Sequence, residues 1–178
     1  FYETSEPLSY YSCSKQTPQN ILIIENKDTF FDIRRYMNSG NDRIMGREFG
    51  TVIYGAGKGI WKTFEDYVNG AERYFLGKNA LFYFGDLDFE GILIFEHLIE
   101  QKQYRESGIH IFKEAYEKML DKAWQLGFSR LPDMKEKQNA NIGTSFLSAF
   151  DAERRHQIRE PLDMGKYIPQ EILNEHDW

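Results

Sequence analysis

The amino-acid sequence predicts an α/β fold in which helices flank a mostly parallel sheet of about four strands. Short runs of branched and aromatic apolar residues recur between residues 21 and 112, and such runs are typical of strands buried on both faces of a parallel sheet. The stretches between these runs carry apolar residues at helical spacing. Strands that alternate with helices in this way favour helical layers on a parallel sheet.

The first strand is expected to follow a lead-in. Residues 1–20 hold two prolines and many Ser, Thr, Tyr and Gln residues, which is typical of an extended linker. Because the chain begins with Phe1 and not with Met, we expect this lead-in to come from a missing N-terminal region. Residues 21–24 predict the first strand, and a helix capped by Asp28 or Thr29 is expected after it.

Three further strands repeat the pattern. They are expected at residues 51–54, 80–84 and 109–112, each with a helical stretch after it. The glycine-rich segment 55–59 is expected to turn the chain from the second strand into a helix over residues 60–68.

The C-terminal quarter differs in character from the rest. Residues 21–128 are expected to form the core, and residues 129–178 a C-terminal helical elaboration of the same domain. Within that elaboration a polar stretch precedes a predicted helix over residues 144–158, and a short helix is expected over residues 170–174.

Composition excludes several classes of protein. Apolar residues make up 41% of the 178 residues, so the chain can form a packed core and is not a disordered protein. No apolar run approaches the ~20 residues of a membrane helix. The net charge of −6 argues against nucleic-acid binding through overall charge, so any such binding has to be local. The single cysteine, Cys13, excludes an internal disulfide and is most simply explained by a reducing, cytoplasmic location.

Acidic residues stand at the carboxyl ends of two predicted strands, where ligands bind in open α/β sheets. Glu25 follows the first strand, and Asp86 and Asp88 follow the third. In an extended segment Asp86 and Asp88 point to one side, and Glu90 continues the alternation. Converging carboxylates repel one another unless a cation lies among them. Oxygen ligands without Cys or His favour Mg²⁺ or Mn²⁺, and such a site is typical of phosphoryl-transfer enzymes.

A structural explanation competes with this one. The D-x-D pattern is common in turns, and Asp88 or Glu90 can simply start the next helix. For Asp86 and Asp88 alone we favour that explanation. Glu25 at the end of another strand, together with glycines on both sides of the acids, reverses the preference.

Basic residues offer weaker signals. The segment 55–59 fits neither a Walker A loop nor a dinucleotide-binding loop, but near the acids Lys58 becomes a plausible phosphate contact. Arg154 and Arg155 form a basic cluster that can contact a DNA backbone, but we favour a solvated helix face as the explanation.

The order strand–Glu, strand–glycine-rich turn, strand–D-x-D resembles the Toprim (Rossmann-like) domain of topoisomerases, bacterial-type primases and several nucleases. Within that fold the chain is most similar to the topoisomerase VI A-subunit branch, and there to the C-terminal domain of JetD, the nuclease subunit of Wadjet anti-plasmid systems. The similarity covers about residues 20–175. The motifs that carry it are Glu25-Asn26-Lys27 with Thr29-Phe30, Tyr54-Gly55-Ala56-Gly57, Gly85-Asp86-Leu87-Asp88-Phe89-Glu90-Gly91 and a late Gln170-Glu171.

This resemblance implies a Mg²⁺-dependent endonuclease that cuts double-stranded DNA together with an SMC-type motor complex. It also implies a winged-helix region before the domain and a homodimer of the full-length protein. Water is the expected nucleophile, because no tyrosine in the sequence can be assigned that role.

The resemblance assigns roles to particular residues. Glu25, Asp86 and Asp88, with Glu90, are expected to hold one or two Mg²⁺ ions, and Glu25 is alternatively a general base. Lys58 is expected to steady a phosphate oxygen. The expected DNA contacts are Lys27, Lys58, Arg154 and Arg155.

Two other functions stay open at this stage. The chain can be the Toprim part of a transesterase of the topoisomerase VI type, which cuts DNA with a tyrosine. It can also be a dimerisation or docking module without catalysis, in which the acids are vestigial or hold a structural metal.

Overall fold

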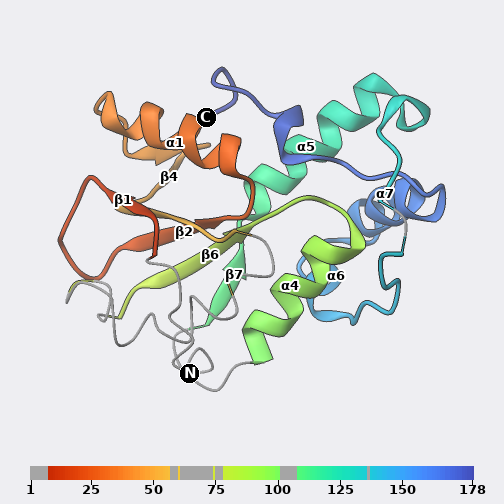
Figure 1. The fold of residues 1–178 in the computed structure, drawn as a ribbon, viewed down its shortest axis with the longest axis horizontal. Coiled ribbons are helices and arrows are strands. Elements are labelled where there is room, and N and C mark those ends of the chain that lie inside the picture. Colours follow the sequence, from red (N-terminus) through yellow and green to blue (C-terminus); the bar gives the residue numbers. More distant parts are fainter. Residues whose placement is uncertain (1–7, 57–59, 61–73, 75–77, 101–107, 136) are drawn as a thin grey trace, which may run out of the picture.

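A computed structural model of the chain describes residues 8–56, 60, 74, 78–100, 108–135 and 137–178. It confirms the α/β class. Helices pack on both faces of a five-stranded sheet (Figure 1). The helix predicted for residues 60–68 lies outside the described residues, apart from Ile60. No helix in the described part of the chain is long and apolar enough to cross a membrane.

The sheet has the strand order β1-β5-β2-β6-β7. Its strands are β1 (Tyr10–Ser12), β5 (Thr51–Tyr54), β2 (Asn20–Ile24), β6 (Ala80–Phe84) and β7 (Ile109–Ile111). The last four pair in parallel, as predicted, whereas β1 is antiparallel to β5. The sheet is therefore mixed.

Strand β1 was not predicted, because it lies in the segment expected to be a linker. Tyr10 pairs with Ile53, and the Ser12 hydroxyl lies 2.7 Å from the Thr51 hydroxyl. The Cys13 amide donates to the Gly50 carbonyl (2.9 Å). A three-residue edge strand is specified by such backbone pairing and carries too few residues to show an apolar alternation.

Strand β2 lies at the centre of the sheet. The chain passes from β2 to β5 on one side and later to β6 on the other side. The carboxyl ends of β2 and β6 therefore meet where the strand order reverses, and a crevice opens at such a point in α/β sheets. Ile24 is in register with Phe84, so the chain leaves both strands at the same level.

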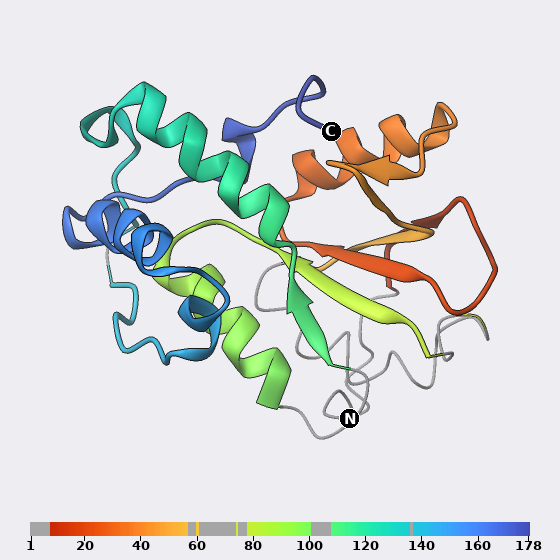
Figure 2. The same cartoon turned by 180° about the vertical axis from the view of Figure 1, so that it is seen from behind.

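The helices that follow these two strands cover opposite faces of the sheet (Figures 1 and 2). Helix α1 (Lys27–Asn38) and helix α5 (Lys113–Leu126) lie on one face, and helix α4 (Phe89–Glu100) lies on the other. The side chain of Asn26 caps α1 by accepting from the Thr29 amide (3.0 Å), so the expected cap at Asp28 or Thr29 is wrong by two or three residues.

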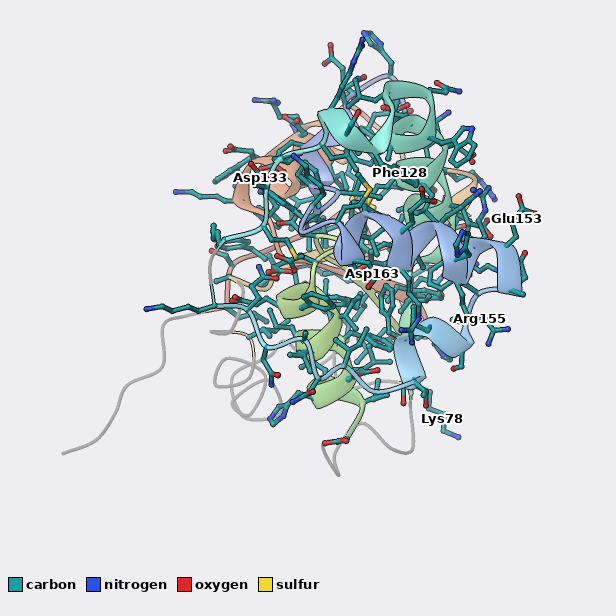
Figure 3. The ribbon with its side chains drawn as sticks, turned by 90° about the vertical axis from the view of Figure 1, so that its right-hand side faces the viewer. Lys78, Phe128, Asp133, Glu153, Arg155 and Asp163 are labelled. Atoms are coloured by element: carbon teal, nitrogen blue, oxygen red, sulfur yellow. The ribbon has the colours of Figure 1, made fainter. Side chains whose placement is uncertain are left out.

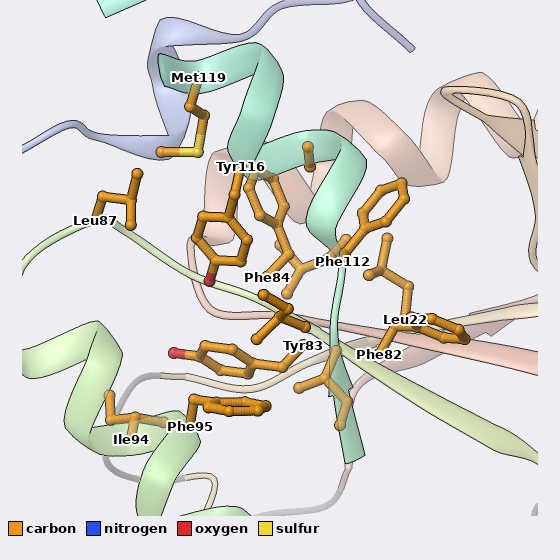
Figure 4. Close-up of a cluster of buried hydrophobic side chains, with 14 of the residues drawn as sticks. Leu22, Phe82, Tyr83, Phe84, Leu87, Ile94, Phe95, Phe112, Tyr116 and Met119 are labelled. Atoms are coloured by element: carbon orange, nitrogen blue, oxygen red, sulfur yellow. The ribbon is translucent and has the colours of Figure 1, made fainter. Parts of the chain in front are cut away.

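Alternation along β6 joins both layers to the sheet (Figure 4). Tyr83 packs on Phe95 of α4, with ring centroids 5.9 Å apart. Its neighbour Phe84 points to the other face and packs edge-to-face on Tyr116 of α5 at 5.5 Å. Residues Ile21 to Ile24 of β2 are fully buried between the two layers, as expected of a central parallel strand.

The C-terminal region folds back on this core. It comprises the 3₁₀ helix η4 (Phe128–Arg130), helices α6 (Ser145–Ser148) and α7 (Ala152–Asp163), and the 3₁₀ helix η5 (Gln170–Ile172). The single helix predicted over residues 144–158 is wrong, because Asp151 accepts from the Arg154 amide (2.8 Å) and starts a new helix there. A separate two-stranded hairpin pairs β3 (Arg43–Ile44) with β4 (Arg47–Glu48).

Candidate functional site

Glu25 and Asp86 lie on neighbouring turns at the carboxyl edge of the sheet. Glu25 follows β2, and its amide donates to the Phe84 carbonyl (3.0 Å), which extends the β2–β6 pairing by one residue. Asp86 follows β6 after Gly85. A Cβ at position 85 would collide with Glu25 Oε2 and with the Tyr83 hydroxyl. Glycine is therefore the residue that leaves room for the Glu25 carboxylate beside the second turn.

The Glu25 carboxylate is largely buried without a cationic partner among the interactions of the described residues. The Tyr83 hydroxyl, itself fully buried, donates to Glu25 Oε2 (2.8 Å). Burial raises the pKa of Glu25 to about 8, and the negative charges of Asp86, Asp88 and Glu90 add to this shift against the Tyr83 hydrogen bond. The four acids identified in the sequence thus act on one another electrostatically.

Asp86 is the second acid with a strongly shifted pKa. The pKa of Asp86 is raised to about 7: burial is the main cause, a hydrogen bond from the Gln170 amide lowers the pKa, and the charges of Asp88 and Glu171 raise it. That amide donates to Asp86 Oδ1 at 2.7 Å. Lys135 also opposes the shift by its positive charge. Two half-buried carboxylates on adjacent turns therefore both have pKa values raised towards neutral pH.

Asp88 has a structural task. Its Oδ1 accepts from the Gly91 amide (2.7 Å), which caps α4, and its Oδ2 accepts from the Gln138 side-chain amide (2.7 Å). The side chain is 9% exposed. The interpretation of Asp88 as a helix start is thus confirmed, and the expected alternation through Glu90 is wrong, because Glu90 lies in the first turn of α4.

The oxygen donors at this edge fit a hard divalent cation better than a soft metal. In the described part of the chain no group of three or more His, Cys, Asp and Glu side chains is placed to hold one metal ion. The paired acids are Glu25 and Asp86, and the buried Oε1 of Gln138, beside Asp88, has no hydrogen-bond partner. Carboxylate and amide oxygens of this kind are ligands of Mg²⁺ and Mn²⁺.

Two of the expected DNA contacts, Arg154 and Arg155, bond to residues other than the acids. Lys58 lies outside the described residues, and Lys27 is exposed at the start of α1. Arg154 pairs with Asp121 of α5 (2.8 Å), and the hydrogen bond to Asp121 raises the pKa of the arginine. The charges of Glu117 and Asp151 raise this pKa as well. Figure 3 shows Arg155 on α7 at the outer surface of the molecule. For these two arginines the solvated helix face is the arrangement observed.

Several residues of the site escaped the sequence analysis. They are Tyr83, Lys135, Gln138 and Tyr167. The pKa of Tyr167 is raised by burial first and then by the charges of Asp86, Glu171 and Asp88. Tyr83 and Gln138 bond to the acids from positions distant in the sequence, and Lys135 and Tyr167 interact with them through charge, so none of the four was marked by a motif. Gln170-Glu171 was singled out only through the family resemblance.

Comparison with known proteins identifies one family. The family model described as "Wadjet protein JetD, C-terminal" matches residues 2–129, a range that contains Glu25, Asp86 and Asp88. No curated protein and no solved structure matches the chain. Since the match spans well over half of the sequence, the chain belongs to the family of C-terminal domains of the Wadjet protein JetD.

Proposed function

We propose that this chain is the metal-dependent nuclease domain of a Wadjet system, and that it hydrolyses phosphodiester bonds of double-stranded DNA with Mg²⁺ or Mn²⁺. The carrying observation is the pair Glu25 and Asp86, two half-buried carboxylates on adjacent turns whose pKa values are both raised mainly by burial, with Asp86 adding to the shift of Glu25. Membership of the JetD family supports a role beside other Wadjet components, which we propose include an SMC-type motor.

The residues of the chain have distinct tasks in this proposal. Glu25 and Asp86 are the residues whose carboxylate oxygens would hold the cation. Asp88 caps α4 directly after the turn that carries Asp86. Glu90 adds negative charge from the first turn of that helix. A bound divalent cation supplies Lewis-acid activation of a phosphate oxygen and lowers the pKa of water. Lys58 keeps its expected contact with a phosphate oxygen.

Water is the proposed nucleophile. Two tyrosines bond to the acid turns: Tyr83 through Glu25, and Tyr116, whose hydroxyl accepts from the Gly85 amide (2.8 Å). Both are fully buried, and burial raises the pKa of each hydroxyl well above its usual value. A phenolate nucleophile is therefore disfavoured at either position. This observation disfavours transesterification by the two tyrosines that contact the acid turns.

The direct test is cleavage of plasmid DNA by the full-length assembly carrying Glu25→Gln or Asp86→Asn. Each variant is expected to lower the rate by about 100-fold or more, because cation activation is worth several kcal/mol and each 1.36 kcal/mol is a factor of ten. Glu48→Gln is the matched control, since Glu48 is exposed on β4 and pairs with Arg43.

Two results would contradict the proposal. Wild-type rates in both Glu25→Gln and Asp86→Asn would support the docking-module function instead. Protein covalently joined to the DNA ends on a denaturing gel would support the transesterase.

A further inference from the structure

The C-terminal segment lies directly against the turn that carries Asp86. The Leu87 amide donates to the Ile168 carbonyl (2.9 Å), and the Ile168 amide donates back to the Leu87 carbonyl (3.2 Å). Two residues later the Gln170 amide reaches Asp86. The segment thus forms a short antiparallel bridge along the turn between β6 and α4.

The side chain of Gln170 connects this turn with the turn that carries Glu25. Its Oε1 accepts from the Asn26 amide (2.8 Å), and its Nε2 donates to the Phe84 carbonyl (3.0 Å). Gln170 is fully buried, and these bonds occupy both ends of its amide. One side chain therefore bonds to the residue after Glu25 and to the last residue of β6.

Neighbouring contacts hold η5 in place. The Asn26 side-chain amide donates to Glu171 Oε1 (2.6 Å), and Lys122 of α5 donates to the Ile172 carbonyl (3.2 Å). Figure 1 shows η5 between α1 and α5, above the carboxyl ends of β2 and β6. The 3₁₀ helix η5 is thus bonded both to the start of α1 and to α5.

We propose that Gln170 is a positioning residue that sets the separation of Glu25 and Asp86, and so tunes the cation affinity of the site. This inference rests on the proposed function. Partners that orient ligating carboxylates through hydrogen bonds typically change metal affinity by about 10- to 100-fold when removed. Gln170 lies outside residues 2–129, the part that matches the family model, so the site is completed by the C-terminal region.

The chemistry at position 170 requires an amide. A carboxylate there would keep the acceptor for Asn26 but place a second oxygen against the Phe84 carbonyl. A methionine would keep the length and the burial and lose both hydrogen bonds. Gln170→Met therefore removes the connection with little change in volume.

The test measures two quantities in the full chain: hydrogen exchange of the Asn26 amide without metal, and the dissociation constant for Mn²⁺. Gln170→Met is expected to speed Asn26 exchange about tenfold or more and to weaken Mn²⁺ binding about tenfold or more. Gln157→Met is the matched control, because Gln157 is half-buried on α7 and bonds only to Arg154 among the interactions recorded for it. The control is expected to change neither quantity.

The outcomes separate this inference from the proposed function. Unchanged Asn26 exchange in Gln170→Met overturns the connection of the two turns by Gln170. Faster exchange with unchanged Mn²⁺ affinity overturns the positioning role. If the wild type binds no Mn²⁺ at all, the proposed function and the tuning of cation affinity both fail, and Asn26 exchange still decides whether Gln170 joins the two turns.

Discussion

At the scale of single residues, the site holds charge that the fold does not neutralise. Glu25 accepts a hydrogen bond from a neutral hydroxyl, and the charged residues that shift its pKa are other acids. A buried carboxylate of this kind favours its protonated form in the folded state. The folded chain without a cation therefore loses stability whenever the pH removes that proton.

Glu25→Gln is expected to stabilise the metal-free chain at high pH. The pKa of Glu25 rises from 4.5 to about 8 on folding, so its contribution to stability is complete below pH 4.5 and is lost as the pH rises towards 8. Glutamine cannot ionise and still accepts from Tyr83. We expect equal free energies of unfolding at pH 4.5, and at pH 8.5 an advantage of about 1–3 kcal/mol for the variant.

Urea denaturation with a chelator present, at both pH values, measures this difference. Glu48→Gln, at an exposed position, controls for the loss of one negative charge. Equal pH dependence of the wild type and Glu25→Gln would show that Glu25 is not held protonated by the fold.

At the scale of elements, the start of α4 explains why Asp88 is buried. Its two oxygens satisfy the Gly91 amide and the Gln138 side chain. The turn is tight, because a Cβ at Gly91 would collide with the Asp86 carbonyl. The D-x-D pattern thus combines two different acids. Asp86 lies at the carboxyl edge of the sheet beside Gln170, and Asp88 caps the helix that carries Glu90.

Asp88→Ala is expected to destabilise the fold by about 2 kcal/mol or more, because it removes a helix cap and leaves the Gln138 amide without a partner. Asp88→Asn is expected to cost less, since its Oδ1 keeps the cap and a rotated Gln138 amide can accept from its Nδ2. Asp151→Ala, at the exposed cap of α7, is the control and is expected to cost about 1 kcal/mol. Thermal unfolding of the three variants checks this order, and a neutral Asp88→Ala would contradict the role as a cap.

At the scale of the whole molecule, an acidic chain with half-buried acids at the carboxyl edge of its sheet is expected to depend on cations. The net charge is −6, and Arg154 and Arg155 of α7 are bonded to Asp121 and to the Asp151 carbonyl. Favourable contact with DNA phosphates then requires a cation at the acids, or basic surfaces from other parts of the assembly. The family match suggests a complex with other Wadjet components, from which such surfaces would have to come.

Divalent cations are expected to raise the melting temperature, and more so at pH 8 than at pH 6, because they compete with protons on Glu25 and Asp86. At 100 times the dissociation constant the gain is about 2.7 kcal/mol, which corresponds to roughly 5–10 °C for a domain of this size. Thermal scans with Mg²⁺ and Mn²⁺ test this. The same shift in the Glu25→Gln/Asp86→Asn double variant would place the cation elsewhere.

The sequence by itself determined the four parallel strands and the positions of the acids along the chain. Continuous apolar runs such as residues 21–24 specify buried strands locally, and Glu25 and Asp86 follow two of them directly. Helix α5 was predictable for the same reason, because its apolar spacing is a local property. Because each acid comes shortly after the last residue of its strand, the sequence also predicted that both acids lie at the carboxyl ends of parallel strands.

Only the tertiary structure decided that β2 lies beside β6, that Asp88 serves as a cap and that Gln170 joins the two acid turns. Gln170 bonds to a residue 84 positions away, and Gln138 to one 50 positions away. Hydrogen bonds over such separations leave no periodicity in the sequence. They form only after the sheet has brought the carboxyl ends of β2 and β6 together and the C-terminal segment has packed against them.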